Sequence, residues 1–354
     1  MKFIHCADLH LDTAFKGLNN SKSASVRQAE LRRTFLSIVE LAKSADALLI
    51  AGDLFDQRTV EAETIHMLRQ AFASLENTKV LIVAGNHDPL TEKSFYKLAG
   101  FSDNVHIFGH ELGMVTVADC DVYGISFSHA VQDTPLLESF STSQSRPAVL
   151  LMHGDLGGTT YNPIQKDAVK NSTISYLALG HVHNYKEEKI GTTHCAYPGC
   201  PEGRGFDELG DKGIIRGEVT EKGVITEFVS VCSRRYHEVT VDVSGLLTHE
   251  MILDAMRSES LNTGDLYKII LTGETELVPD PDVLSEALNE CFFAKVYDET
   301  RRPLNLDALK KEAGVRSMLI EALEAGLTGE QSELYRKALE YGLAALDGKK
   351  VKSL

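Results

Sequence analysis

The feature that most constrains this chain is a repeated pattern in which a short apolar run ends in a cluster of polar residues. DALLI precedes GDLFD at residues 52–56, and KVLIVA precedes GNHD at residues 85–88. Short apolar runs of this kind are typical of buried strands in a largely parallel sheet. Because functional groups gather at the carboxyl ends of such strands, we expect the polar clusters to meet at one edge of the sheet.

Strands are predicted at six short apolar runs, namely 2–7, 46–51, 79–84, 121–126, 148–152 and 175–180. Two amphipathic stretches, 24–45 and 60–76, predict helices between the first three strands. This order is typical of strand–helix–strand units. Several later strands follow one another without helices, so we expect an α/β fold of the layered α-β-β-α sandwich type rather than a doubly wound sheet.

After about residue 232 the pattern changes to a small α/β unit. Its predicted strands are 236–244, 265–274 and 292–299, and its predicted helices are 249–259 and 280–290. From Leu304 to Leu346 the pattern is helical, with apolar residues at Leu334, Ala338, Tyr341 and Leu346. We therefore predict a main domain over 1–232, a capping α/β domain over 233–302 and a C-terminal helical region over 303–354.

Composition limits the class of protein. With 354 residues, 43% of them hydrophobic, the chain is long enough for a large globular domain and a smaller one. We expect no membrane association and a cytoplasmic location, because no apolar run approaches a membrane span and the N-terminus lacks a secretory signal. The six scattered cysteines predict reduced, mostly buried thiols. A net charge of −15 argues against bulk electrostatic binding of nucleic acid but leaves a local basic track open.

Five strand ends supply oxygen or imidazole groups. The residues are Asp8, His10, Asp53, Asn86, His87, His153, His181 and His183. Mixed oxygen and imidazole ligands suit Mn, Fe or Zn better than Ca, and the set is large enough for two ions. A single DxH or GDxxD is common by chance, and a lone histidine such as His5 is usually a core residue. The ordered set of five is not expected by chance.

The series DxH, GDxxD, GNHD, H and GHxH resembles the signature of the calcineurin-like metallophosphoesterases. The segments ADLHLD, AGDLFD, AGNHDPL, LALGHVH and YPGCPEGRGFDELGDKG resemble the bacterial DNA-repair exonucleases of the SbcD and YhaO type, relatives of the double-strand-break repair nuclease. The last of these segments supports the narrower assignment. Cys200 stands where Ser or Asn is expected after YPG, and the chain is shorter than typical members.

The resemblance implies two metal sites. Asp8, His10, Asp53 and His183 would hold one divalent ion, and Asp53, Asn86, His153 and His181 the other, with Asp53 bridging. Mn²⁺ is the expected metal, with Fe²⁺, Zn²⁺ and Mg²⁺ as alternatives. Two such ions, about 3.5–4 Å apart, can bind phosphate oxygens and activate a water for in-line attack. His87 is left outside both sets. We expect it to stabilise the transition state or to protonate the leaving oxygen, with Asp88 orienting its ring.

The substrate side is less defined by the sequence. Arg204 is the predicted substrate-binding residue, while Tyr161, Asn162 and Lys212 suit either substrate contact or ordinary loop roles. The pairs Arg32-Arg33, Arg234-Arg235 and Arg301-Arg302 suit either a DNA track or a salt-bridged surface, with the surface favoured.

The resemblance implies a DNA exonuclease, with single-strand endonuclease activity as a further expectation, acting with an SMC-like coiled-coil ATPase. It is also compatible with a homodimer. Two alternatives stay open: a phosphoesterase acting on nucleotides or other small phosphodiesters, and a non-catalytic scaffold for the ATPase. The complete ligand set argues against the scaffold. The C-terminal helices would either pack on a core of their own or bind the ATPase.

Overall fold

Two mixed β-sheets form the main body of the protein. The computed structural model describes residues 1–18, 21–56, 60–142, 145–303, 306, 310–311, 314–329 and 331–348. The first sheet has the order β14-β13-β1-β2-β3-β4. Its strands are β1 (Lys2–Cys6), β2 (Ala47–Ala51), β3 (Lys79–Val83), β4 (Val105–Ile107), β13 (Gly213–Thr220) and β14 (Gly223–Ser230). Strands β1 to β4 are parallel, whereas β13 runs antiparallel to β1.

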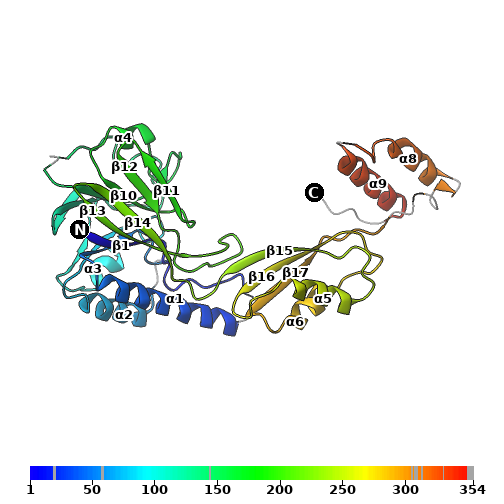
Figure 1. Ribbon diagram of the computed structural model, residues 1–354, viewed down its shortest axis with the longest axis horizontal. Coiled ribbons are helices and arrows are strands. Elements are labelled where there is room, and N and C mark those ends of the chain that lie inside the picture. Colours follow the sequence, from blue (N-terminus) through cyan, green and yellow to red (C-terminus); the bar gives the residue numbers. More distant parts are fainter. Residues whose placement is uncertain are drawn as a thin grey trace.

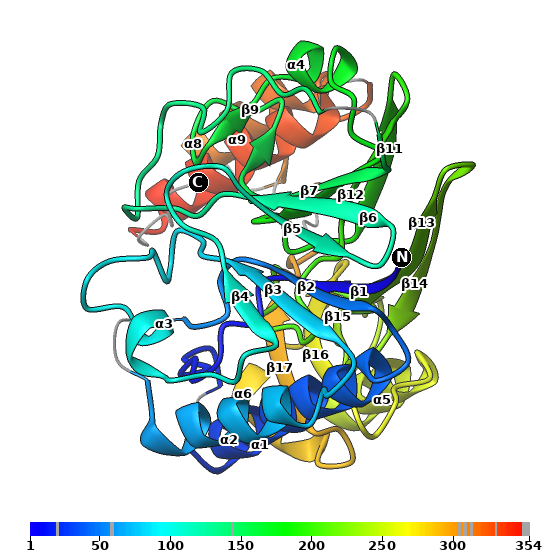
Figure 2. The ribbon, with the colours of Figure 1, turned by 90° about the vertical axis from the view of Figure 1, so that its left-hand side faces the viewer.

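The second sheet has the order β11-β12-β10-β7-β6-β5. Its strands are β5 (Gly113–Val117), β6 (Cys120–Gly124), β7 (Ala148–His153), β10 (Tyr176–Gly180), β11 (Lys186–Ile190) and β12 (Thr193–Tyr197). A short pair, β8 (Asp155–Leu156) and β9 (Pro163–Ile164), follows β7. Helices α1 (Ser21–Ala42) and α2 (Ala62–Ala73) lie along the first sheet, with α3 (Phe95–Leu98) after β3 and α4 (Lys166–Lys170) beside the second sheet (Figure 2).

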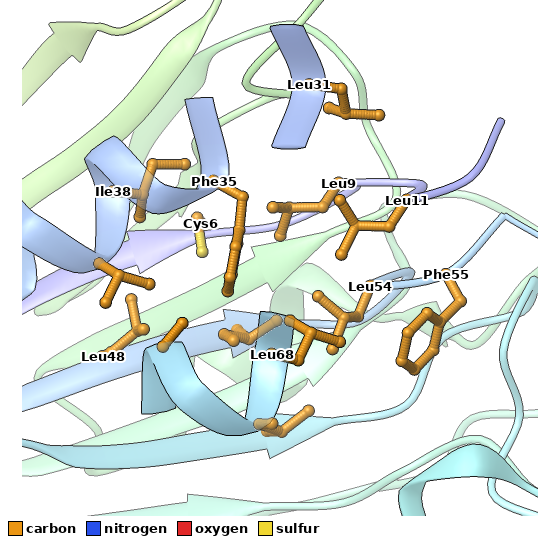
Figure 3. Close-up of a cluster of buried hydrophobic side chains, with 14 of the residues drawn as sticks. Cys6, Leu9, Leu11, Leu31, Phe35, Ile38, Leu48, Leu54, Phe55 and Leu68 are labelled. Atoms are coloured by element: carbon orange, nitrogen blue, oxygen red, sulfur yellow. The ribbon is translucent and has the colours of Figure 1, made fainter. Parts of the chain in front are cut away.

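The layering follows from strands that are apolar on both faces. In β2, Leu48 and Ile50 join a cluster with Phe35 and Leu68 of the helices, whereas Leu49 joins the cluster between the two sheets. Successive side chains of a strand point to opposite faces, so one apolar run serves two cores. Figure 3 shows the helix-side cluster. The predicted α-β-β-α sandwich is confirmed, as are the helices before β2 and β3.

A second α/β unit follows the sandwich. Its elements are β15 (Tyr236–Asp242), α5 (His249–Ser258), β16 (Leu266–Thr272), α6 (Pro281–Ala287) and β17 (Phe293–Asp298). The three strands are parallel and cover a core that includes Ile252, Ile269 and Leu284. Each element falls within its predicted range, and Figure 1 shows the unit extending away from the sandwich. The domain boundaries at 232 and 302 stay predictions.

Two helices, α8 (Val315–Glu324) and α9 (Ser332–Leu346), occupy the predicted helical region. Of the predicted C-terminal region 303–354, residues 304–305, 307–309, 312–313, 330 and 349–354 lie outside the described residues. Ile320 and Leu339 are buried, but Leu334 is 63% exposed. The helical spacing is therefore correct, while Leu334, named from that spacing, does not lie in a core.

The cysteines and the lengths of the helices bear on two predictions made from composition. All six cysteines lie in described segments and form no disulfide there, and all except Cys232 are buried, which confirms the predicted burial. No helix in the described ranges is both long enough and apolar enough to span a membrane.

Candidate metal centre

The carboxyl ends of β1, β2, β3, β7 and β10 meet where the two sheets face each other. After β1, Leu9 and Leu11 are buried in the helix-side core shown in Figure 3. Asp8 and His10 alternate with these leucines and are buried as well, but they join the polar cluster. The apolar residues thus anchor the segment, and the polar residues between them form the site.

The backbone at this site is strained. Positive φ angles occur at Asp8 (51°), His10 (46°), Asp53 (50°) and His181 (106°), all expected metal ligands. A non-glycine residue held in an unfavourable backbone conformation costs about 1–3 kcal/mol, and such residues cluster at functional sites. Surrounding hydrogen bonds hold two of these residues, because His10 N donates to Asp53 O at 2.9 Å and Asp8 N donates to Gly52 O at 3.2 Å.

Glycine precedes several of these ligands because the site has no room for a β-carbon. A Cβ at Gly52, where φ is 89°, would overlap the His153 ring. A Cβ at Gly85 would overlap the Asp53 carboxylate. The glycines of the GD and GN motifs therefore let ligands from different strands approach one another.

The first expected ligand set is brought together. One ligand atom each from Asp8, His10 and His183 lies within 4.8 Å of the others. His183 Nε2 is 3.9 Å from Asp8 Oδ1. His10 Nε2 is buried with no hydrogen-bond partner in the described chain. An unpartnered buried nitrogen is costly unless it binds something, so this atom suits a metal ligand.

The second expected set is also brought together. Asn86 Oδ1 lies 2.9 Å from His153 Nε2 and 3.2 Å from His181 Nδ1. The His153 ring donates through Nδ1 to the Ala51 carbonyl at 2.9 Å, which leaves a lone pair on Nε2. That lone pair faces the Asn86 oxygen, and two acceptors this close are compatible with a cation that both bind. A backbone carbonyl that orients the second ring nitrogen is typical of metal-binding histidines.

Asp53 lies between the two sets. Its Oδ1 accepts a hydrogen bond from His87 N at 2.9 Å, which orients the carboxylate. Its Oδ2 is then 3.8 Å from His10 Nε2 and 3.6 Å from His153 Nε2. One oxygen thus faces a histidine from each set, as a bridging ligand requires.

The histidines are held in the neutral form that binds metals. Burial lowers the pKa of His10 to about 4 and the pKa of His181 to about 4, and it also lowers the pKa of His153. His183 differs: burial acts to lower its pKa, but the carboxylates of Glu208 and Asp8 raise it overall. Most of the imidazoles therefore offer lone pairs rather than positive charge.

Asp53 consequently faces neutral histidines rather than a counter-charge. Burial, followed by repulsion from Asp88 and Asp8, raises the pKa of Asp53 well above its usual value. A carboxylate in this position is stabilised by a bound cation. The orphaned His10 nitrogen, the facing acceptors and this carboxylate all fit divalent metal ions.

His87 lies at the rim, and its side chain is 42% exposed. Its ring is 4.7 Å from the His10 ring, and Nδ1 lies 3.2 Å from the Asp56 carbonyl oxygen. A nitrogen of His87 also falls within 4.8 Å of His10 and Asp53 ligand atoms, so the geometry alone permits His87 as a ligand. Its catalytic role stays a prediction.

Asp88 does not orient the His87 ring, contrary to the prediction. Its Oδ1 accepts from Gly85 N at 2.8 Å, and its Oδ2 accepts from Phe55 N at 3.1 Å and from the Tyr96 hydroxyl. Because these donors occupy the buried carboxylate, Asp88 instead supports the loop that carries Asn86 and His87.

Asp56, the last residue of GDLFD, is a contact that the sequence argument missed. Its Oδ1 lies 3.2 Å from His10 Nδ1 and 3.5 Å from Arg204. Although burial acts in the opposite direction, His10 and Arg204 lower the pKa of Asp56 to about 2. Asp56 therefore lies against the His10 ring on the side away from Nε2.

Glu208 was missed too, although it lies in the YPG segment four residues after Arg204. His183 Nδ1 lies 2.7 Å from Glu208 Oε1, and Arg204 Nη2 donates to the same oxygen at 2.8 Å. Burial opposes ionisation, yet His183 and Arg204 lower the pKa of Glu208 overall. A carboxylate that holds one ring nitrogen is typical of metal-binding histidines, and the other nitrogen, His183 Nε2, has Arg204 Nη2 at 3.5 Å.

The other candidates separate into two groups. Tyr161 packs its ring 5.0 Å from the His181 ring, and Arg204 lies beside the centre. In contrast, the Asn162 side chain donates to His153 O and accepts from Leu136 N, both at 2.8 Å. Lys212 is buried and donates to His183 O at 3.1 Å. These last two residues have loop roles, which was one of the two predicted alternatives.

The paired arginines are largely salt-bridged, as favoured from the sequence. Arg32 pairs with Asp12 at 2.9 Å, Arg234 with Glu30 at 2.8 Å, and Arg301 with Glu333 at 2.7 Å. Among the histidines expected to have no metal role, His5 is buried and contacts the Tyr176 hydroxyl at 2.9 Å.

The amino-acid sequence is similar to those of several known proteins. A family model described as calcineurin-like phosphoesterase matches residues 1–185. An uncharacterized metallophosphoesterase YhaO from Bacillus subtilis is 28% identical over 264 residues, which cover 69% of this chain and 64% of that protein. The DNA double-strand break repair protein Mre11 from Methanopyrus kandleri is 26% identical over 361 residues, covering 90% of this chain and 77% of that protein.

A third relative is the SbcD component of the nuclease SbcCD from Bacillus subtilis, 24% identical over 254 residues that cover 59% of this chain and 64% of that protein. The match therefore spans less than two thirds of both Bacillus proteins. Among solved structures, TT1561 of Thermus thermophilus aligns with a TM-score of 0.40 and 11% identity, covering 65% of this chain and 98% of that one.

Proposed function

Because this chain belongs to the calcineurin-like phosphoesterase family and is distantly related to YhaO, Mre11 and SbcD, we propose that it is a two-metal phosphodiesterase that cleaves DNA as an exonuclease. The observation that carries the proposal is the position of Asp53. Its Oδ2 faces His10 of one ligand set and His153 of the other. That arrangement suits two neighbouring ions, and a pair of ions suits phosphoryl chemistry.

The residues of the site are proposed to have different roles. Two divalent ions held by these ligands, Mn²⁺ foremost, would neutralise the phosphate and activate a water. Asp53 holds its carboxylate toward both sets because His87 N fixes the other oxygen. The Asn86 amide would bind a metal ion without adding negative charge, which would preserve the attraction for a phosphodiester. His87 Nδ1 donates to the Asp56 carbonyl, and Nε2 has no hydrogen-bond partner in the described residues, so the imidazolium form of His87 can give its Nε2 proton to the leaving oxygen.

Arg204 is proposed to support binding of the substrate phosphate. Its side chain is 18% exposed, and it lies beside the centre with Asp56 and Glu208 as partners. Because both partners are acidic, they hold the guanidinium in one position and partly neutralise its attraction for a substrate phosphate. Single-strand endonuclease activity, a homodimer and the cytoplasmic location stay predictions.

We also propose that the C-terminal helices bind an SMC-like ATPase with a long coiled coil. Val315 and Met318 on α8 are 65% and 67% exposed, and Leu334 on α9 is 63% exposed. Apolar residues exposed on an amphipathic helix pair suit a helix-in-groove contact. Such a contact would leave the metal centre free.

The test uses purified protein with Mn²⁺ on end-labelled single- and double-stranded DNA, alongside bis-p-nitrophenyl phosphate. We expect hydrolysis of the small diester and stepwise shortening of DNA, both abolished by chelation. Hydrolysis of the small diester with intact DNA would support the alternative, a phosphoesterase for nucleotides or other small diesters. Failure on both substrates would contradict the enzyme proposal.

A further inference from the structure

A pocket of about 310 Å³ adjoins the metal centre at His87. Its walls come from Phe55 after β2 and from the segment that runs from His87 to Phe95 at the start of α3. The described residues that line it include none of the seven expected metal ligands. The pocket is therefore separate from the ligand set but shares His87 with the reaction centre.

The pocket wall is aromatic and its rim is polar. The Phe55 and Phe95 ring centroids are 6.1 Å apart, and Pro89 lines the same wall. Phe55 is anchored in the helix-side core of Figure 3, whereas Phe95 is only partly buried. Thr91 and Lys93 are exposed at the pocket, and neither side chain has a hydrogen bond or ion pair within the described ranges. Apolar walls with a few free polar groups are typical of small-ligand sites.

This chemistry fits a nucleobase. A base has a flat face that stacks on aromatic side chains and a polar edge that accepts and donates hydrogen bonds. The volume lies at the lower end of the range for ligand pockets, about 300–1,000 Å³. Such a pocket accommodates one ring system rather than a base pair, so the base that enters must be unpaired.

The position of His87 indicates which base enters. In an in-line displacement, the group that protonates the leaving oxygen stands on the leaving-group side of phosphorus. The His87 ring contacts His10 of the metal centre and also lines the pocket. The remainder of the leaving nucleoside therefore extends past His87 toward Phe95.

We propose that this pocket binds the unpaired base of the nucleoside that leaves during hydrolysis. The inference rests on the proposed function and deepens it by assigning a substrate subsite. Stacking on an aromatic side chain changes binding by about ten- to a hundredfold per base. We expect the wild-type protein to favour a leaving residue that carries a base by about tenfold.

The kinetic test compares a normal dinucleotide with two analogues, each lacking the base at one position. Removal of the base from the leaving residue, identified from the products, should lower kcat/KM by about tenfold. Phe95→Leu, which retains apolar bulk but loses the ring, should remove this preference. Leu98→Ala is the matched control, because Leu98 lies on the same helix α3, is 69% exposed and does not line the pocket.

A binding measurement decides the same question without catalysis. In saturation-transfer NMR with thymidine, we expect signal on the base protons for wild type and Leu98→Ala, and its loss for Phe95→Leu. Equal rates on normal and abasic dinucleotides together with no thymidine signal would overturn the subsite. A thymidine signal combined with intact DNA and hydrolysed small diester would overturn the nuclease proposal and leave the base pocket standing.

Discussion

The two sides of the metal centre are held in different ways. On one side, His183 contacts the Glu208 carboxylate, which also forms an ion pair with Arg204. A histidine that faces the expected metal position is therefore held by charged neighbours. On the other side, His87 is 42% exposed, and its ring nitrogens have one hydrogen-bond contact in the described chain, to Asp56 O. This difference fits the proposed roles, in which His183 is a firmly held metal ligand and the solvent-facing His87 acts on the substrate.

The largest effect tests the residue common to both sides. Asp53→Ala should abolish hydrolysis and reduce bound metal, because it removes the carboxylate oxygen that faces His10 and His153. Metal content by mass spectrometry and turnover of bis-p-nitrophenyl phosphate measure both effects. Asp103→Ala, at an exposed position, is the control. Normal turnover with two bound ions would refute the bridging assignment.

The next largest effect is expected from a change at the solvent-exposed His87. His87→Ala should lower turnover of DNA by about 10²–10⁴-fold while both ions stay bound, as expected for a proton donor. The loss should be smaller with bis-p-nitrophenyl phosphate, because p-nitrophenolate leaves without a proton. His110→Ala, at an exposed position, should have no effect. If metal content fell in parallel with rate, His87 would be a ligand instead.

A smaller effect is expected from a change at Glu208, which contacts His183. Glu208→Gln should weaken metal binding by about 10–100-fold, since the amide no longer holds His183 as the carboxylate does. Titration calorimetry with Mn²⁺ measures the affinity, and excess Mn²⁺ should restore most of the turnover. Glu221→Gln, at an exposed position, is the matched control. Unchanged affinity for Mn²⁺ together with reduced turnover would show that Glu208 acts in the reaction rather than in metal binding.

The smallest effect on catalysis comes from a region outside both sides. Truncation after Arg302 should leave metal loading and small-diester hydrolysis unchanged, because α8 and α9 contribute no residue to the centre. The truncated protein should no longer co-purify with its ATPase. Insoluble protein would mean that the helices pack as part of the core, and retained binding would place the interface elsewhere.

The meeting of the strand-end residues could be predicted because each follows a local pattern, an apolar run that ends in a polar residue. Asp8, Asp53 and His153 all follow such runs, and the sheets bring their ends together. Strand-like and helical stretches in alternation likewise identified the second α/β unit. Resemblance to a family then divided the residues into two ligand sets, which spacing alone could not do.

What the sequence missed depends on contacts between distant segments. Glu208 reaches His183 across 25 positions, and Asp56 reaches Arg204 from another strand end. Asp88 follows His87 directly, yet backbone donors from Gly85 and Phe55 turn its carboxylate elsewhere. Neighbours in sequence were therefore a poor guide to side-chain contacts, and the YPG segment was the one available signal for Glu208.

The most direct measurement of the central claim is anomalous diffraction from crystals soaked in Mn²⁺. We predict two peaks about 3.5–4 Å apart. One should lie among Asp8, His10 and His183, the other among Asn86, His153 and His181, with Asp53 binding both and His87 binding neither. A single peak, or a peak ligated by His87, would contradict the account.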